Sequence, residues 1–243
     1  EPPVNLLDFT NIGYQSYYVA QEELDLLEKM CFEAHRLGNI TGDLRIIEPA
    51  MRAAVQKDGI DMVPFSTFRD FNTQLRIWNY KYIGKKPLYD ADGQVRERNG
   101  MTEEQIIRHI LDWSALPGGS RHHWGTEIDV VDAAVMPTGY QPKLLPIEVE
   151  EGGIFYALHQ WLDDNIHRFG FFRPYQKQQG GMFPEPWHLS YASLSTQAMK
   201  ELSPELLADT LRETEILGKE TVLSLLPEIY QNHILNIATV PTL

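Results

Sequence analysis

Two short segments of the sequence carry side chains that could bind a metal ion and promote hydrolysis. In the first, SRHHWGTEID, His122 precedes Asp129 by seven positions. In the second, EPWH, Glu185 precedes His188 by three positions. Two imidazoles and one carboxylate with an open fourth position are typical of a catalytic zinc site. Glu185 would remain as a spare carboxylate that accepts a proton from the bound water, whose pKa zinc lowers to about 7.

Each segment taken alone also fits a purely structural role. His188 could pack beside Trp187, and Asp129 could cap a turn. Two such segments in one chain are much harder to obtain by accident, which favours the metal site. Five further histidines are expected on helices or near helix ends, as partly exposed residues: His35, His109, His159, His167 and His233.

The elements that must position these segments follow from periodicity. Apolar residues at helical spacing predict helices over 21–37, 42–57, 70–82 and 154–168. Another helix starts at 102–105 and ends before Pro117. Two more are predicted over 195–237, broken near Gly218 and Pro227. Alternating or short apolar runs predict strands over 61–66, 126–132 and 185–191. A packed lead-in is expected over 1–18, a capping Asp70 before its helix, and a surface loop over 84–100. Helices and short strands mixed in this order indicate an α+β domain with a helical C-terminal extension.

The amino-acid composition excludes several classes of protein and of binding partner. The 243 residues carry 21 basic and 34 acidic side chains, a net charge of −13, with 43% apolar residues. This balance argues against a nucleic-acid partner, which usually leaves a basic footprint, and no apolar stretch is long enough for a membrane span. The single Cys31 excludes an internal disulfide. The chain begins at Glu1 without a basic-then-apolar leader, so we expect any signal peptide to have been removed or omitted.

The two metal-binding segments resemble those of the zinc D-Ala-D-Ala carboxypeptidases of the VanY and VanX type. That group is related to the L,D-carboxypeptidase LdcB, and it shares its metal-site fold with lysostaphin-type endopeptidases and the hedgehog signalling domain. The similarity reaches upstream to the segment STFRDFNTQ, which is similar to the family's Ser-Gly-Tyr-Arg segment followed by a glutamine. The match spans roughly Phe65 to Tyr191. It implies a small antiparallel sheet that carries the zinc site and is flanked by helices, with a peptidase domain over 1–194 and a helical extension over 195–243 packed on it.

The resemblance also implies a role for each matching residue. His122, Asp129 and His188 would be the zinc ligands, and Glu185 would be the catalytic base. Arg69 would hold the terminal carboxylate of the substrate or steady the oxyanion, and Gln74 and Ser120 would help to place the peptide. A guanidinium suits the first task because it can donate two parallel hydrogen bonds to one carboxylate. A surface ion pair with Asp70 is the plainer alternative for Arg69.

The chain departs from the family pattern at three positions. Glu127 stands where the family usually has alanine, and because it lies two positions before Asp129 in a strand, it shares the face of that ligand. Glu127 could therefore bind a cationic group of the substrate, alter metal affinity or turn to solvent. Thr67 replaces the usual glycine, and His123 adjoins a ligand, as a residue that supports the ligands or faces the substrate.

The expected function is hydrolysis of the C-terminal D-alanine from peptidoglycan stem peptides by a zinc carboxypeptidase. D,D-specificity is favoured over L,D-specificity, and an endopeptidase is the next enzyme hypothesis. A zinc-containing cell-wall binding module is the alternative without catalysis, and Glu185 argues against it. The implied substrate places the protein in the periplasm or at the cell envelope. The sequence leaves the oligomeric state open.

Overall fold

The computed structural model of the chain describes residues 50–240. The predicted lead-in and the helix over 21–37 lie outside the described residues, as does the first half of the helix over 42–57. Residues 50–55 are helical, and the 3-10 helix Gln56–Asp58 follows them.

Four short antiparallel strands form the centre of the fold. They are β1 (Met62–Ser66), β2 (Glu127–Asp132), β3 (Phe171–Phe172) and β4 (His188–Tyr191), in the spatial order β1-β2-β4-β3. This arrangement confirms the predicted α+β class with a small antiparallel sheet. The third strand is an addition to the prediction. The predicted strand over 185–191 is too long, because the chain turns at 185–187 and β4 begins only at His188.

The two faces of β2 have different partners. Ile128 and Val130 pack into an apolar cluster that contains Leu158 and Leu162 of helix α6 (Tyr156–Asn165). Because side chains alternate along a strand, Glu127 and Asp129 project from the opposite face. All six residues of β2 are buried. The predicted alternation of apolar and polar residues along this strand is therefore correct, but its polar face is buried within the protein and not exposed to solvent.

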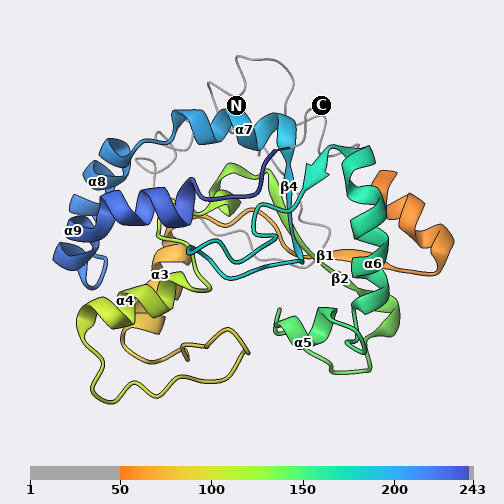
Figure 1. Cartoon of the computed structure of the whole chain (residues 1–243), viewed down its shortest axis with the longest axis horizontal. Coiled ribbons are helices and arrows are strands. Elements are labelled where there is room, and N and C mark those ends of the chain that lie inside the picture. Colours follow the sequence, from red (N-terminus) through yellow and green to blue (C-terminus); the bar gives the residue numbers. More distant parts are fainter. Residues whose placement is uncertain (1–49, 241–243) are drawn as a thin grey trace, which may run out of the picture.

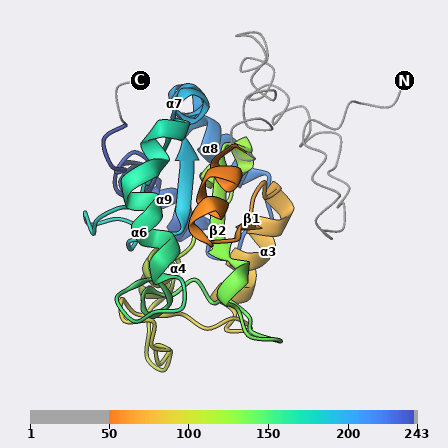
Figure 2. The ribbon, with the colours of Figure 1, turned by 90° about the vertical axis from the view of Figure 1, so that its right-hand side faces the viewer.

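Helices lie on both sides of the sheet (Figures 1 and 2). α6 occupies one side and is prolonged by the 3-10 helix Ile166–Phe169, while α3 (Phe71–Tyr82) and α4 (Glu103–Leu111) lie on the other. Asp70 caps α3 as predicted, since its side chain accepts from the backbone of Thr73. Thr102 starts α4 with a capping box. A short helix, α5 (Pro146–Val149), was not predicted, and the chain between α3 and α4 is a loop as expected.

The C-terminal part contains three helices where two were predicted. They are α7 (Ala192–Glu201), α8 (Pro204–Arg212) and α9 (Lys219–Ile229). Gly218 marks the start of α9, but Pro227 lies inside α9 and does not end it. The proline removes one N–H from the hydrogen-bond ladder of α9, yet the chain stays helical through the π-helix Tyr230–Ile234.

One apolar cluster joins the C-terminal helices to the helices before the site. Trp78 of α3 and Ile107 of α4 pack in it together with Leu207 of α8 and Val222 of α9. Figure 1 shows these helices gathered on one side of the sheet. Among residues 50–240, no helix has the length and apolar character that crossing a bilayer requires.

Candidate metal centre and active site

The register of the sheet brings two of the predicted ligands together. Asp129 of β2 lies directly opposite His188 of β4, and Ser66 of β1 pairs with Asp129 on its other side. Directly opposed residues of antiparallel strands project from the same face. The Oδ1 atom of Asp129 consequently lies 3.1 Å from Nδ1 of His188.

The third predicted ligand, His122, comes from the 3-10 helix Arg121–Trp124, which immediately precedes β2. Gly125 ends this helix with a φ of 68°, a left-handed conformation that glycine adopts without strain. The Nδ1 of His122 lies 2.7 Å from the carbonyl oxygen of Thr67. Because a carbonyl only accepts, Nδ1 carries the proton. The Nε2 atom is left with its lone pair, 3.4 Å from Oδ2 of Asp129.

These three side chains fit a metal ion of the zinc type. Their ligand atoms all lie within 4.8 Å of one another. Oδ1 of Asp129 and Nδ1 of His188 are buried and have no hydrogen-bond partner among the described residues. Because buried polar atoms are almost always paired, two such atoms facing each other indicate that another group completes the site. Two histidines and one carboxylate are a donor set that zinc accepts.

The protonation of the two histidines also bears on metal binding. Burial lowers the pKa of His122, although Asp129 opposes this effect, so that His122 is the neutral imidazole that a metal requires. Burial disfavours a charge on His188 too, but the carboxylates of Asp129 and Glu127 raise its pKa to about 10. A metal ion bound at Nδ1 would therefore displace a proton from this side chain.

Glu127 contacts the ring nitrogen of His188 that points away from Asp129. Its Oε2 atom lies 2.8 Å from Nε2 of His188, and its Oε1 atom accepts a hydrogen bond from the hydroxyl of Ser190, which faces Glu127 across the strands. Thr126 donates to the same oxygen. Burial alone would raise the pKa of Glu127, but Arg121 and the hydrogen bonds from His188 and Ser190 lower it to about 2.

The predicted substrate-binding role of Glu127 is wrong. This side chain is only 1% exposed and does not line the cavity, because Arg121, Ser190 and His188 surround its carboxylate. The shared strand face was predicted correctly. The side chain does not turn to solvent either. Its contact with His188 is consistent with the remaining alternative, an effect on metal affinity.

Glu185 occupies the position expected of a proton acceptor. It lies in the turn before β4, where its backbone N–H donates to Tyr175 and its carbonyl accepts from the N–H of His188. The Oε2 atom is 3.7 Å from Nδ1 of His188. Burial raises the pKa of Glu185 to about 7, although the charge of His188 opposes this shift. A carboxylate with a pKa near neutrality is well matched to general acid–base catalysis.

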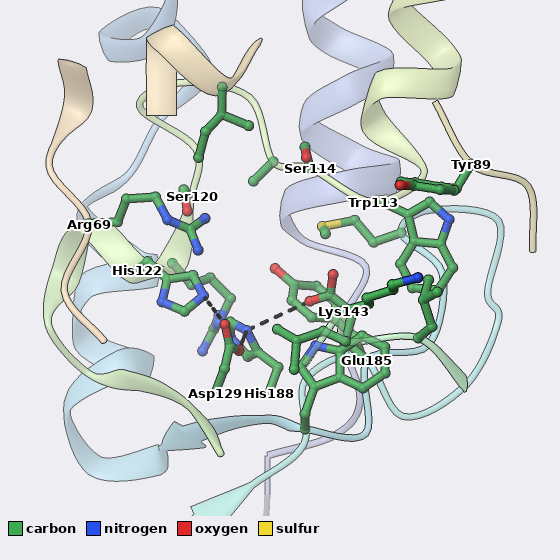
Figure 3. A pocket seen from close by; sticks show the side chains of 18 of the residues that line it. Arg69, Tyr89, Trp113, Ser114, Ser120, His122, Asp129, Lys143, Glu185 and His188 are labelled. Atoms are coloured by element: carbon green, nitrogen blue, oxygen red, sulfur yellow. Dashed lines mark ion pairs between the residues drawn. The ribbon is translucent and has the colours of Figure 1, made fainter. Parts of the chain in front are cut away.

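A cavity of about 310 Å³ opens in front of the three ligand side chains. Glu185, Arg69 and Ser120 line it together with His122 and His188. Figure 3 shows Arg69 and Ser120 beside His122, and Glu185 turned toward the space in front of the ligands. The structure thus gathers these predicted residues around one hollow.

Gln74 has a different place from the one predicted. It is fully buried and does not line the cavity. Its Oε1 accepts a hydrogen bond of 2.9 Å from Arg69, and its amide donates to the carbonyl of Ala115. A second hydrogen bond joins Arg69 to the hydroxyl of Ser66. Gln74 therefore fixes the guanidinium and does not itself touch a peptide in the cavity.

His123 also supports Arg69. Its Nδ1 lies 2.6 Å from the carbonyl oxygen of Arg69, and its Nε2 accepts from the N–H of Gly118. Burial lowers the pKa of His123 to about 4, which keeps the ring neutral. The side chain is buried and does not line the cavity, so it supports the neighbouring segments and does not face a substrate.

Many lining residues were absent from the site predicted from the sequence, among them Trp113, Tyr175 and Lys81. Trp113 stacks on Trp187 at one wall, with ring centroids 6.2 Å apart, and the ring of Tyr175 packs edge-on against His188. Neither Trp113 nor Tyr175 belongs to a local motif that could have revealed it. Lys81 lines the cavity as well. Its signal was available, since it lies seven positions after Gln74 and such residues share one face of a helix.

Comparison with known proteins identifies two relatives by sequence. An uncharacterized protein of Haemophilus influenzae is 37% identical over 121 residues, which are 49% of this chain and 92% of that protein. A D-alanyl-D-alanine carboxypeptidase of Enterococcus faecalis is 26% identical over 144 residues, which are 58% of this chain but only 44% of the relative.

Two VanY proteins and LdcB are among the solved structures that this chain resembles. VanYB in complex with D-Alanine-D-Alanine has a TM-score of 0.46 at 23% identity, over 69% of this chain and 81% of that one. A mutant of the D,D-pentapeptidase VanY in complex with Zn(II) has a TM-score of 0.44 at 23% identity, over 63% and 73%. The LdcB LD-carboxypeptidase has a TM-score of 0.40 at 24% identity, over 68% and 73%.

The family assignment comes from the sequence model described as VanY, D-alanyl-D-alanine carboxypeptidase. It matches residues 47–194, which are more than half of the chain and contain the site described above. The chain therefore belongs to the VanY family of D-alanyl-D-alanine carboxypeptidases.

Proposed function

We propose that this chain is a zinc-dependent carboxypeptidase that removes the C-terminal D-alanine from peptidoglycan stem peptides. One observation carries the proposal: the ligand atoms of His122, Asp129 and His188 converge within 4.8 Å beside the buried carboxylate of Glu185, in a cavity that Arg69 also lines. Membership of a carboxypeptidase family supports the reaction class.

Each side chain then has a defined task. His122, Asp129 and His188 would hold the zinc, which when bound supplies Lewis acidity toward the scissile carbonyl and lowers the pKa of a water molecule. Glu185 accepts the proton of the attacking water and passes it to the amine that leaves. Arg69 contributes positive charge, either to the terminal carboxylate of the peptide or to the oxygen on which negative charge develops.

The family description and the Enterococcus relative support D,D-specificity. The test incubates the zinc-loaded protein separately with a stem pentapeptide, which ends in D-Ala-D-Ala, and a stem tetrapeptide, and identifies the products by mass. We expect D-alanine from the pentapeptide alone. The matched control is Glu185→Gln, which removes the proton acceptor and keeps the size of the side chain.

Other outcomes would replace the proposal by a defined alternative. Release of D-alanine from the tetrapeptide alone would make the chain an L,D-carboxypeptidase. Cleavage of a peptide with a blocked C-terminus would make it an endopeptidase. Binding to purified peptidoglycan without any release, with zinc bound, would indicate a binding module.

The proposed substrate also leads to a proposal on location. Stem peptides of the cell wall lie outside the cytoplasm, so the protein would act in the periplasm or at the cell envelope. Fractionation of the native host cells tests this, with the protein expected in the periplasmic or envelope fraction. Recovery in the cytoplasmic fraction alone would contradict it.

A further inference from the structure

Lys81 lines the cavity and has no anionic partner among residues 50–240. It occupies the last turn of α3 and lines the same hollow as Glu185 and Arg69. Arg98 donates to the backbone carbonyl of Lys81 at 2.8 Å and also binds the next carbonyl, so the end of the helix is held in place. The position of Lys81 is therefore built into the fold.

The ammonium of Lys81 has one polar partner among the described residues. Its Nζ donates to the hydroxyl of Ser114 at 2.7 Å, and no carboxylate of the described chain lies within 4 Å of it. Burial lowers the pKa of Lys81 to about 8, an effect that Glu185 opposes and that Lys86 reinforces. A charge withdrawn from water is costly unless an opposite charge compensates it. Such a lysine, facing a substrate cavity, is suited to an anion that arrives with the substrate.

Arg69 is already committed to another part of the cavity. Two hydrogen bonds, to Gln74 and Ser66, fix its guanidinium, and its backbone N–H donates to the carbonyl of His122. Figure 3 shows Arg69 next to His122 and Ser114 at a separate place on the rim. Lys86, Arg121 and Lys143 also line the cavity, but of its cations Arg69 lies beside the candidate ligand His122 and Lys81 donates to Ser114.

We propose that Lys81, with the hydroxyl of Ser114, binds the free C-terminal carboxylate of the substrate and so makes the enzyme an exopeptidase. This inference rests on the proposed function and assigns the two cations separate tasks. Lys81 pairs with one carboxylate oxygen and Ser114 donates to the other, while Arg69 is left to stabilise the oxygen of the scissile carbonyl. A terminal carboxylate is the one anion that every substrate of a carboxypeptidase shares.

Two peptides that differ only at the C-terminus test the proposal. Acetyl-Ala-D-Ala-D-Ala is compared with its C-terminal amide, and the released D-alanine or D-alaninamide is quantified by mass. The zinc-loaded protein should prefer the free acid. Lys81→Met should lower kcat/KM for the acid about 10- to 100-fold, mainly through KM, and should lower kcat/KM for the amide far less, since hydrogen bonds to charged groups are worth this much.

Lys85→Met is the matched control, because Lys85 is exposed, packs over the ring of Tyr80 and does not line the cavity. It should retain the full preference for the acid. Ser114→Ala, a milder change, should lower kcat/KM for the acid alone by a smaller factor, and it keeps the test open if Lys81→Met fails to fold. A Lys81→Met enzyme that still prefers the acid as strongly as its parent would overturn the proposal.

A binding measurement separates this inference from the proposed function. In the zinc-loaded Glu185→Gln variant, calorimetry compares the affinities of the acid and the amide with and without Lys81→Met. Preference for the acid that disappears with Lys81→Met supports the carboxylate subsite even if the parent protein releases no D-alanine. Equal binding of acid and amide with Lys81 present would refute the subsite even if the parent releases D-alanine.

Discussion

The Oε2 atom of Glu127 lies 2.8 Å from Nε2 of His188, and this contact determines which nitrogen of His188 faces the other ligands. An ionised carboxylate only accepts hydrogen bonds, so Nε2 must carry a proton. The opposite nitrogen, Nδ1, is directed at Asp129. Carboxylates that hold a ligating histidine in this way fix its tautomer and raise its basicity. Glu127 thus orients His188, one of the three candidate metal ligands.

Replacing Glu127 by glutamine should weaken zinc binding about 10- to 100-fold, the usual effect of losing a group that orients a ligand. Titration of the protein against a fluorescent chelator measures this affinity. Ser190→Ala removes one hydrogen bond to Glu127 but leaves its charge, and should have a smaller effect. An unchanged zinc affinity in a folded Glu127→Gln protein would show that His188 does not need this contact.

Substitutions of the proposed ligands and of the proposed proton acceptor should have different effects on bound zinc and on activity. His122→Ala, Asp129→Asn and His188→Ala each remove one donor and should reduce bound zinc below one equivalent. Glu185→Gln should keep one equivalent and lower kcat by about 10²- to 10⁴-fold, the usual contribution of general acid–base catalysis. Metal analysis and D-alanine release are measured on the same samples. Loss of zinc from Glu185→Gln would make Glu185 a ligand and not a base.

Gln74→Leu should slow the reaction without touching the substrate. The change removes the acceptor that holds one amino group of Arg69, and we expect kcat/KM to fall about 10-fold, the typical size of one lost hydrogen bond to a charged group. Ser66→Ala removes the other anchor and should act in the same direction. If both variants keep the parental rate while Arg69→Lys loses it, the anchors are not what positions the guanidinium.

Acid should destabilise the fold through His159. This histidine, read from the sequence as partly exposed, is buried against Arg173, and burial together with that charge lowers its pKa to about 3. The neutral form is favoured in the folded state, so its stabilising effect is complete above the unfolded pKa of about 6.5 and declines toward pH 3. His159→Gln should reduce the slope of unfolding free energy between pH 6 and 4 by up to about 1.4 kcal/mol per unit.

Chemical denaturation across this pH range measures that slope. His167→Gln is the control, since His167 is exposed and should leave the slope unchanged. Parallel curves for the parent and His159→Gln would contradict the assignment.

The sequence was most informative where chemistry is encoded in local spacing. His122 and Asp129 lie within one ten-residue segment, and Glu185 and His188 within a four-residue segment, so the candidate ligands and the candidate proton acceptor could be predicted together. The caps at Asp70 and Thr102 were equally local signals. These features depend only on residues that are close together in the sequence.

What could not be predicted depends on contacts between distant segments. The strand period placed Glu127 on the face of Asp129, but its pairing with His188 follows from the register of β2 on β4, which no local pattern specifies. Pro227 was expected to break the C-terminal helices, but it lies inside α9, which the π-helix Tyr230–Ile234 follows. Helical spacing from Gln74 indicates the helix face on which Lys81 lies, but its contact with Ser114 depends on how distant segments pack.

The most direct test of the account titrates zinc into metal-free protein and follows D-alanine release from the stem pentapeptide at each step. We predict that release rises in proportion to zinc and saturates at one equivalent per chain. In parallel, Glu185→Gln should bind the same equivalent and release almost nothing. Full release from the metal-free protein, or undiminished release by zinc-loaded Glu185→Gln, would contradict a single zinc centre served by this carboxylate.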